Sequence, residues 1–186
     1  MRLINTKTLK LSEFPDSRCP KYAILSHTWG SKEVALSDWQ RLEYRATRKG
    51  FAKIAGLCKL ASSVYSLDYA WVDTCCIDKS SSADLSEGIN SMYRYYEEAA
   101  VCIVYMSDVP ASCNALEDKA VNQSRWFTRG WTLQELLVPK HVAFFGQGWN
   151  LLGILSSNSK RGEAKSIAEY TNIPEEVLKH VKRPSG

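Results

Sequence analysis

The chain has 186 residues, of which 45% are hydrophobic and 24% are charged, and its formal net charge is +4. This length predicts one domain, with a core that needs neither disulfides nor a structural metal. The charges are scattered without a run of five like signs, which argues against a nucleic-acid-binding protein. No apolar stretch has the length of a membrane span, and the first residues lack the apolar run of a signal peptide.

The spacing of cysteine and histidine argues against a metal site and against an oxidising compartment. The six cysteines form no C-x-x-C pair, and the three histidines show no zinc-ligand spacing. Most of the cysteines lie in apolar runs, where cysteine behaves as a small hydrophobic residue. We therefore expect a reduced, cytoplasmic protein without a metal and without a membrane partner.

The first half of the chain is predicted to alternate strands and helices. Residues 2–4 and 9–11 are short extended pieces around a polar turn, which predicts a small N-terminal hairpin or edge addition. Residues 22–26 form a continuous apolar run, typical of a parallel strand that is covered on both faces. Apolar residues recur at helical spacing over 51–65, after a helical or turn-like stretch at 37–48.

The second half continues this alternation. A strand that runs into a loop is followed by a helix, a third strand, a loop, a short helix and a fourth strand, and then by a loop and two short helices. The strands are residues 68–78, 101–106 and 141–145, and the helices between them are residues 80–99 and 131–137. The loops are residues 110–123 and a stretch that begins at 149, and the last two helices are residues 163–170 and 174–181. The alternation predicts a parallel α/β sheet with right-handed crossovers.

Small and hydrogen-bonding residues follow the first core strand, namely Ser26, His27, Thr28, Trp29 and Gly30. Open α/β sheets bind ligands outside the carboxyl ends of their strands, so this segment is a candidate binding loop. The alternative is a polar turn held by one anchoring tryptophan, with His27 packed as an ordinary core histidine.

Asp73, Thr74 and Asp78 lie at or past the end of the second strand. Two carboxylates at a strand end can bind a metal or the hydroxyls of a ribose. They can equally hold the loop through hydrogen bonds of the Asx-turn type. A metal-dependent hydrolase or nuclease built on Asp73 and Asp78 is the weaker hypothesis, because no third acidic ligand lies nearby.

The segment from Arg125 to Leu137 (RWFTRGWTLQELL) places a carboxylate next to an indole. Gly130 breaks the segment, and a helix after it puts Trp131 and Glu135, four residues apart, on one face. An aromatic neighbour can desolvate a carboxylate and so strengthen its interaction with a ligand. The alternative is a solvated glutamate that happens to follow a core tryptophan.

Four stretches together carry a resemblance to a known family. They are residues 22–30 (YAILSHTWG), 69–79 (YAWVDTCCIDK), 89–96 (INSMYRYY) and 124–137 (SRWFTRGWTLQELL). In this order they resemble the HET (heterokaryon incompatibility) domain family of filamentous fungi. The resemblance implies a HET domain over residues 1–155, with residues 156–186 as a C-terminal helical extension.

HET domains in turn look like remote relatives of TIR domains. This implies a TIR-like, flavodoxin-like fold, in which a central parallel sheet has helices on both faces, plus the small N-terminal extended addition. TIR domains that hydrolyse NAD carry a helix pattern W-C-L-x-E-L with a catalytic glutamate. Residues 131–136 (WTLQEL) stand in its place, which makes Glu135 the candidate catalyst, although Thr132 replaces the cysteine. Residues 26–29 also differ from the aromatic and arginine of many TIR domains, so the pose of the substrate does not carry over.

The resemblance implies an NAD glycohydrolase that acts as a cell-death effector in fungal non-self recognition, with NAD as its substrate and no separate cofactor. Expected partners are further copies of the domain and an upstream sensor. The walls of the site would be the residues after the two strands, with Trp29 as a stacking surface. The alternative is a non-catalytic signalling module that works by homotypic contact, with Glu135 capping a helix or lying in an interface. The enzymatic interpretation requires Glu135 to face a cleft at the strand ends, and neither bulk solvent nor the protein interior.

Overall fold

The computed structural model describes residues 1–156, which fall into two compact units. Of these described residues, the first unit comprises 1–25 and 29–95, and the second comprises 26–28 and 96–156. The strand that precedes the candidate binding loop is therefore divided between the units. Its first four residues belong to one unit and its last two to the other.

The sheet of the first unit has the strand order β2-β1-β4-β3. Its strands are β1 (Arg2–Asn5), β2 (Leu11–Glu13), β3 (Tyr22–His27) and β4 (Tyr69–Trp71). β1 pairs antiparallel with both β2 and β4, whereas β3 and β4 are parallel. The predicted N-terminal hairpin is thus confirmed, but its second strand begins at Leu11. Leu9 lies in the turn with a φ of 53°, which is outside the range of a strand.

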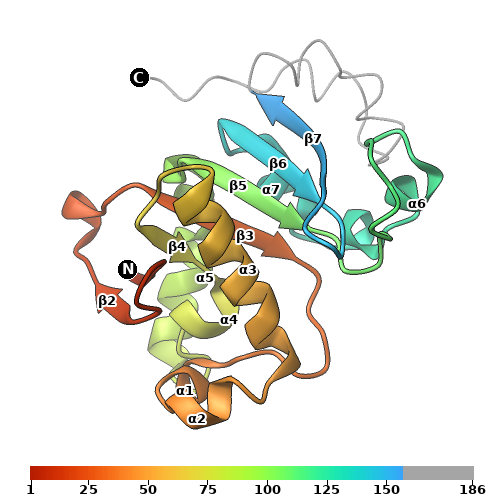
Figure 1. Ribbon diagram of the computed structural model, residues 1–186. Helices are drawn as coiled ribbons and strands as arrows, with labels where there is room; N and C mark the ends of the chain where they lie inside the picture. Colours follow the sequence, from red (N-terminus) through yellow and green to blue (C-terminus); the bar gives the residue numbers. More distant parts are fainter. Residues whose placement is uncertain (157–186) are drawn as a thin grey trace. The chain divides into compact units, whose positions relative to one another are not determined.

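Two long helices accompany these strands, and Figure 1 shows α3 in front of them and α5 behind them. α3 (Lys49–Ser63) buries Ile54, Leu57, Cys58 and Ala61, which recur three to four residues apart, as an amphipathic helix requires. α5 spans Ser82–Glu98, and its last three residues are counted with the second unit. The shorter elements are η1 (Asp16–Arg18), α1 (Leu36–Trp39), α2 (Leu42–Arg45) and α4 (Asp73–Cys76).

The second strand of the prediction does not run straight into a loop. The chain turns instead into α4, because the N–H groups of Cys75 and Cys76 bond back to the carbonyl of Val72, at 3.3 and 2.9 Å. This short helix buries Thr74, Cys75 and Cys76. Asp73, at its first position, stays partly accessible.

The second unit contains the strand order β5-β6-β7, formed by β5 (Val101–Tyr105), β6 (His141–Phe145) and β7 (Leu151–Ser156). β5 and β6 are parallel, and β6 and β7 are antiparallel. The loop predicted from residue 149 covers only residues 149–150, because β7 begins at Leu151. Gly153 interrupts its apolar pattern, and a Cβ there would lie 2.6 Å from Cδ1 of Leu116.

The helices of the second unit are short. They are α6 (Lys119–Asn122), the 3₁₀ helix η2 (Arg125–Thr128) and α7 (Thr132–Leu137). α6 forms within the stretch predicted as a loop, whereas α7 lies where a helix was predicted. The α/β class is confirmed, with parallel pairs at β3/β4 and β5/β6. The predicted helices at 163–170 and 174–181 lie outside the described residues. Within residues 1–156, no helix has the length and hydrophobicity to cross a membrane.

Candidate functional site

Glu135 is buried in the second unit and its carboxylate is held by two residues. The residue is only 3% exposed, so the solvated glutamate considered from the sequence is wrong. Ser26 is the next-to-last residue of β3, and its hydroxyl donates to Oε2 at 2.5 Å. Arg129 donates from Nη1 to Oε2 at 2.7 Å and from Nη2 to Oε1 at 2.9 Å. Such a bidentate pair is the strongest geometry for an arginine and a carboxylate.

Trp131 and Glu135, the pair that the sequence placed on one helix face, differ in exposure. Trp131 is 47% exposed, while Glu135 is 3% exposed. Trp131 is the N-cap residue of α7 and precedes its first helical residue. Its backbone is nevertheless helical, with φ −89° and ψ −10°, and its carbonyl accepts the N–H of Glu135 at 3.1 Å, so the predicted helical spacing of the pair is present.

The aromatic residue that completes the site is Trp126, in η2. It is fully buried, and its indole N–H donates to the Ser26 hydroxyl at 2.6 Å. The ring packs edge-on against Phe127 and Phe144, with centroid distances of 5.0 and 5.7 Å. Because the Ser26 oxygen accepts from the indole and donates to Glu135, the three side chains form one hydrogen-bonded chain.

Thr132 ties α7 to η2. Its hydroxyl donates to the backbone carbonyl of Trp126 at 2.6 Å, and the residue is 4% exposed. A cysteine here, as in the TIR pattern, would offer only a weak donor. The threonine thus fixes the spacing between the helix that carries Glu135 and the turn that carries Trp126.

Asp108 anchors the start of η2. It accepts from the Ser124 hydroxyl and from the backbone N–H of Arg125, both at 2.8 Å. Burial acts to raise the pKa of Asp108, but these hydrogen bonds outweigh burial and leave the pKa below its usual value. Ser124 also accepts the N–H of Trp126 at 3.2 Å, so these bonds together hold the first residues of η2.

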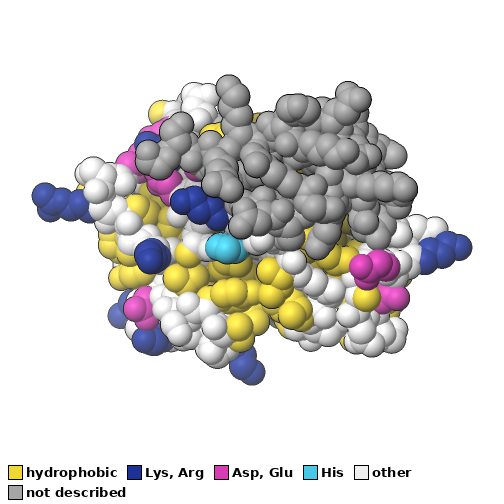
Figure 2. Space-filling view, turned by 90° about the horizontal axis from the view of Figure 1, so that it is seen from above, with side chains coloured by type: hydrophobic (Ala, Val, Ile, Leu, Met, Phe, Trp, Pro, Cys, Tyr) yellow, Lys and Arg dark blue, Asp and Glu magenta, His cyan; other side chains and the backbone are white. Residues whose placement is uncertain are grey.

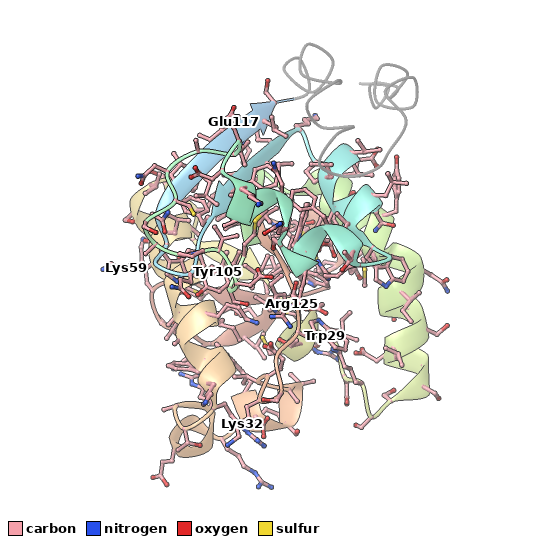
Figure 3. The ribbon with its side chains drawn as sticks, turned by 90° about the vertical axis from the view of Figure 1, so that its right-hand side faces the viewer. Trp29, Lys32, Lys59, Tyr105, Glu117 and Arg125 are labelled. Carbon is pink, nitrogen blue, oxygen red and sulfur yellow. The ribbon has the colours of Figure 1, made fainter. Side chains whose placement is uncertain are left out.

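Trp29 and Asp73 meet in the first unit. The indole N–H of Trp29 donates to Oδ2 of Asp73 at 2.9 Å, and the Trp29 ring is 56% exposed (Figure 3). The Lys79 ammonium lies 3.5 Å from the centroid of that ring and 3.9 Å from the same carboxylate oxygen. Burial lowers the pKa of Lys79. In this cation–π contact, the ammonium covers one face of the Trp29 ring.

The other candidates of the first unit make local contacts. The N–H of Gly30 donates to Oε1 of Glu33 at 2.6 Å. Asp78 accepts from the N–H and hydroxyl of Ser80, at 2.9 and 2.6 Å, and these bonds lower its pKa. This is the loop-holding alternative considered for Asp78. Thr74 is buried in α4.

The candidate residues thus form separate groups. Ser26 and Glu135 meet in the second unit, where His27 is also buried and Thr28 is partly exposed. Trp29 and Asp73 meet in the first unit. Among residues 1–156, no three His, Cys, Asp or Glu side chains come together as metal ligands.

Sequence reasoning missed Arg129, Trp126 and Lys79. For Trp126 and Arg129, a signal was available in the same segment as Glu135, where an arginine six residues before a glutamate flanks a glycine break. Lys79 directly follows Asp78 and is the last residue of the stretch 69–79 (YAWVDTCCIDK). The spacing alone did not indicate which of these side chains turns inward.

Comparison with known proteins agrees with the resemblance in the sequence. The sequence model of the family described as "Heterokaryon incompatibility protein (HET)" matches residues 22–117. The chain is also 40% identical over 173 residues to "Vegetative incompatibility protein HET-E-1" of Podospora anserina. That alignment covers 90% of this chain but only 12% of the relative, so the chain spans a small part of its length. No solved structure matches. With its fold, its motifs and this relative in agreement, the chain belongs to the heterokaryon incompatibility (HET) family.

Proposed function

We propose that this HET domain acts as a cell-death effector in fungal non-self recognition by cleaving the nicotinamide–ribose bond of NAD, with Glu135 as the catalytic residue. The observation that supports the proposal is the 2.5 Å hydrogen bond between Ser26 and Glu135. It brings the carboxylate of the TIR-like helix pattern to the carboxyl end of a core strand, where α/β folds bind their ligands.

The chemistry follows from the bond that breaks. The C1′–N bond of NAD gives its electron pair to nicotinamide, which leaves as a neutral molecule, and the ribose gains oxocarbenium character. Water adds to C1′ and loses a proton, so the products are ADP-ribose, nicotinamide and one proton. A carboxylate beside the ribose stabilises the developing positive charge. Glu135 would supply that negative charge, and Ser26 would hold the orientation of the carboxylate.

The described arrangement does not meet the requirement set from the sequence, that Glu135 face a cleft and not the protein interior, and this sets a condition on the proposal. Glu135 lies in the interior of the second unit, and its charge is balanced by Arg129. The catalytic interpretation needs the carboxylate to reach a substrate, so the site must open before it can react.

Release of nicotinamide from NAD by the purified protein tests the proposal directly. Removing one preorganised stabilising group costs about 10²–10³ in rate, so Glu135→Gln should lose most of the activity. Glu117→Gln is the matched control, because Glu117 is exposed (Figure 3). Equal rates for wild type and Glu135→Gln would remove Glu135 from catalysis. The assay is run over a range of protein concentrations, since TIR-type sites are often completed by oligomerisation. No release anywhere in that range removes the enzymatic proposal.

A second function, recognition by homotypic contact, is favoured by exposed apolar side chains in the second unit. Trp131, Leu133, Leu151 and Ile154 are each between 44% and 55% exposed. Figure 2 shows hydrophobic side chains gathered on the face that is seen from above. Under this function, Trp131→Ser with Leu133→Ser should abolish self-association and signalling, and Glu135→Gln should abolish neither. Sedimentation analysis and a cell-death assay in a fungal host separate the two functions.

A further inference from the structure

The position of Arg129 bears on what Glu135 can bind. Three of the acceptor positions of the carboxylate are filled, two by the Arg129 guanidinium and one by Ser26. The Glu135 side chain is 4% exposed and the Arg129 side chain is 20% exposed. Of the two side chains that hold the carboxylate, Arg129 is therefore the more accessible, since Ser26 is 0% exposed.

The guanidinium and the reacting sugar share a chemical property. The guanidinium is a planar cation that pairs edge-on with a carboxylate. The ribosyl group of the proposed reaction becomes a flattened cation as nicotinamide leaves, and it needs the same negative charge. One carboxylate edge cannot serve both cations at once, since two like charges at that distance repel each other.

The connection that follows Arg129 is exposed and loosely packed. Arg129 is the extended residue that ends η2, with φ −81° and ψ 145°. Gly130 follows, and a side chain at that position would meet no atom within 4 Å. Trp131 comes next and is 47% exposed. The connection from Arg129 to Trp131 thus runs along the surface, while both elements that it joins are anchored by Trp126 and Thr132.

We infer that the Arg129 guanidinium occupies the place on Glu135 that the cationic end of the substrate takes during the reaction. The described arrangement is then the closed form of the site, and opening exchanges one cation for another. This inference rests on the proposed function for its substrate. The binding of a cation at this place is a separate property that can be measured without NAD.

The test uses Arg129→Ala, with methylguanidine to refill the vacated place and neutral methylurea as its isosteric control. An open state that is a minor form is typically about 0.1–10% populated, so a permanently open variant should release nicotinamide about 10- to 1,000-fold faster than wild type. Millimolar methylguanidine should slow Arg129→Ala and raise its melting temperature, and methylurea should do neither. Arg125→Ala is the matched control, because the Arg125 side chain is 67% exposed (Figure 3). It should behave as wild type in both measurements.

Each outcome decides the inference. If folded Arg129→Ala is no faster than wild type, or if methylguanidine has no effect on it, the inference is overturned. If Arg129→Ala does not fold, Arg129→Lys takes its place, because one ammonium cannot reproduce the bidentate pair. Arg129→Lys should then be faster than wild type, and a rate equal to or below that of wild type overturns the inference. If no variant releases nicotinamide, the proposed reaction fails, and the change in melting temperature with methylguanidine alone decides whether the place binds a cation.

Discussion

The indole nitrogen of Trp126 lies 2.6 Å from the hydroxyl oxygen of Ser26, although 100 positions of sequence separate the two residues. An indole can only donate, so the Ser26 oxygen must accept this bond. The hydroxyl hydrogen is then directed to Oε2 of Glu135, 2.5 Å away. Trp126 thus orients one of the two side chains that hold the carboxylate.

Trp126→Phe should destabilise the protein, because it removes the indole donor and leaves a space in a fully buried position. The lost hydrogen bond and the cavity together should lower the free energy of unfolding by about 1–3 kcal/mol. Trp131→Phe makes the same chemical change at a position that is 47% exposed, and should stay within about 0.5 kcal/mol of wild type. Urea denaturation of the two variants measures both values. Equal losses would mean that the Ser26 bond has no energetic role.

The pair of Arg129 and Glu135 should show strong coupling in a double-mutant cycle. Arg129→Met leaves a buried, unpaired carboxylate, and should lower the free energy of unfolding by about 3–5 kcal/mol. Adding Glu135→Leu removes that charge, so the double variant should regain most of the loss. Urea denaturation of both single variants and the double variant provides the coupling energy. Additive losses would show that the two charges do not depend on one another.

Acid should weaken the first unit through Asp84. Hydrogen bonding and charge from Arg2, with Nη1 2.9 Å away, outweigh burial and lower the pKa of Asp84. A carboxyl whose pKa is lower in the folded state stabilises that state above its unfolded pKa of about 3.9, and this stabilisation is lost as pH falls through the folded value. Asp84→Asn should therefore be less stable at neutral pH and should lose less on acidification. Denaturation at neutral pH and at acid pH checks this, and parallel pH profiles for the two proteins would contradict it.

Gly153 in β7 should not tolerate a larger residue without a matching change. A Cβ there would lie 2.6 Å from Cδ1 and 2.7 Å from Cγ of Leu116. Gly153→Ala must displace this side chain, at a cost of about 1–3 kcal/mol. Leu116→Ala makes room, so the double variant should lose less stability than the sum of its single variants. The melting temperatures of the two single variants and the double variant measure these losses. A Gly153→Ala variant as stable as wild type would show that Leu116 moves freely.

Much of the fold could be predicted from residues because its main strands are continuous apolar runs. The run that became β3 is buried at all six positions, as a parallel strand covered on both faces should be. β7 escaped prediction because Gly153 divides its apolar residues, and because antiparallel pairing with β6 is a tertiary contact that local pattern does not encode. α4 was missed for a similar reason, since its four residues follow an apolar strand without a break.

The candidate site was predictable in its carboxylate but not in the surroundings of that carboxylate. The helix with Glu135 follows from the glycine break and the apolar stripe after it. Which residue covers Glu135 depends on how η2 folds, and a 3₁₀ turn of four residues has too little periodicity to read from sequence. The same turn brings Trp126 inward and sets the start of the connection that carries Arg129.

The division of β3 between the units has a practical consequence for work with fragments. The chain passes from one unit to the other after Leu25, after Thr28 and after Tyr95. A fragment that began at Tyr96 would contain Glu135, Arg129 and Trp126 but would lack Ser26, which accepts from the indole and donates to the carboxylate. A cut before Tyr96 therefore splits the hydrogen-bonded chain, and a fragment meant for study of its chemistry must contain both Ser26 and the segment from Trp126 to Glu135.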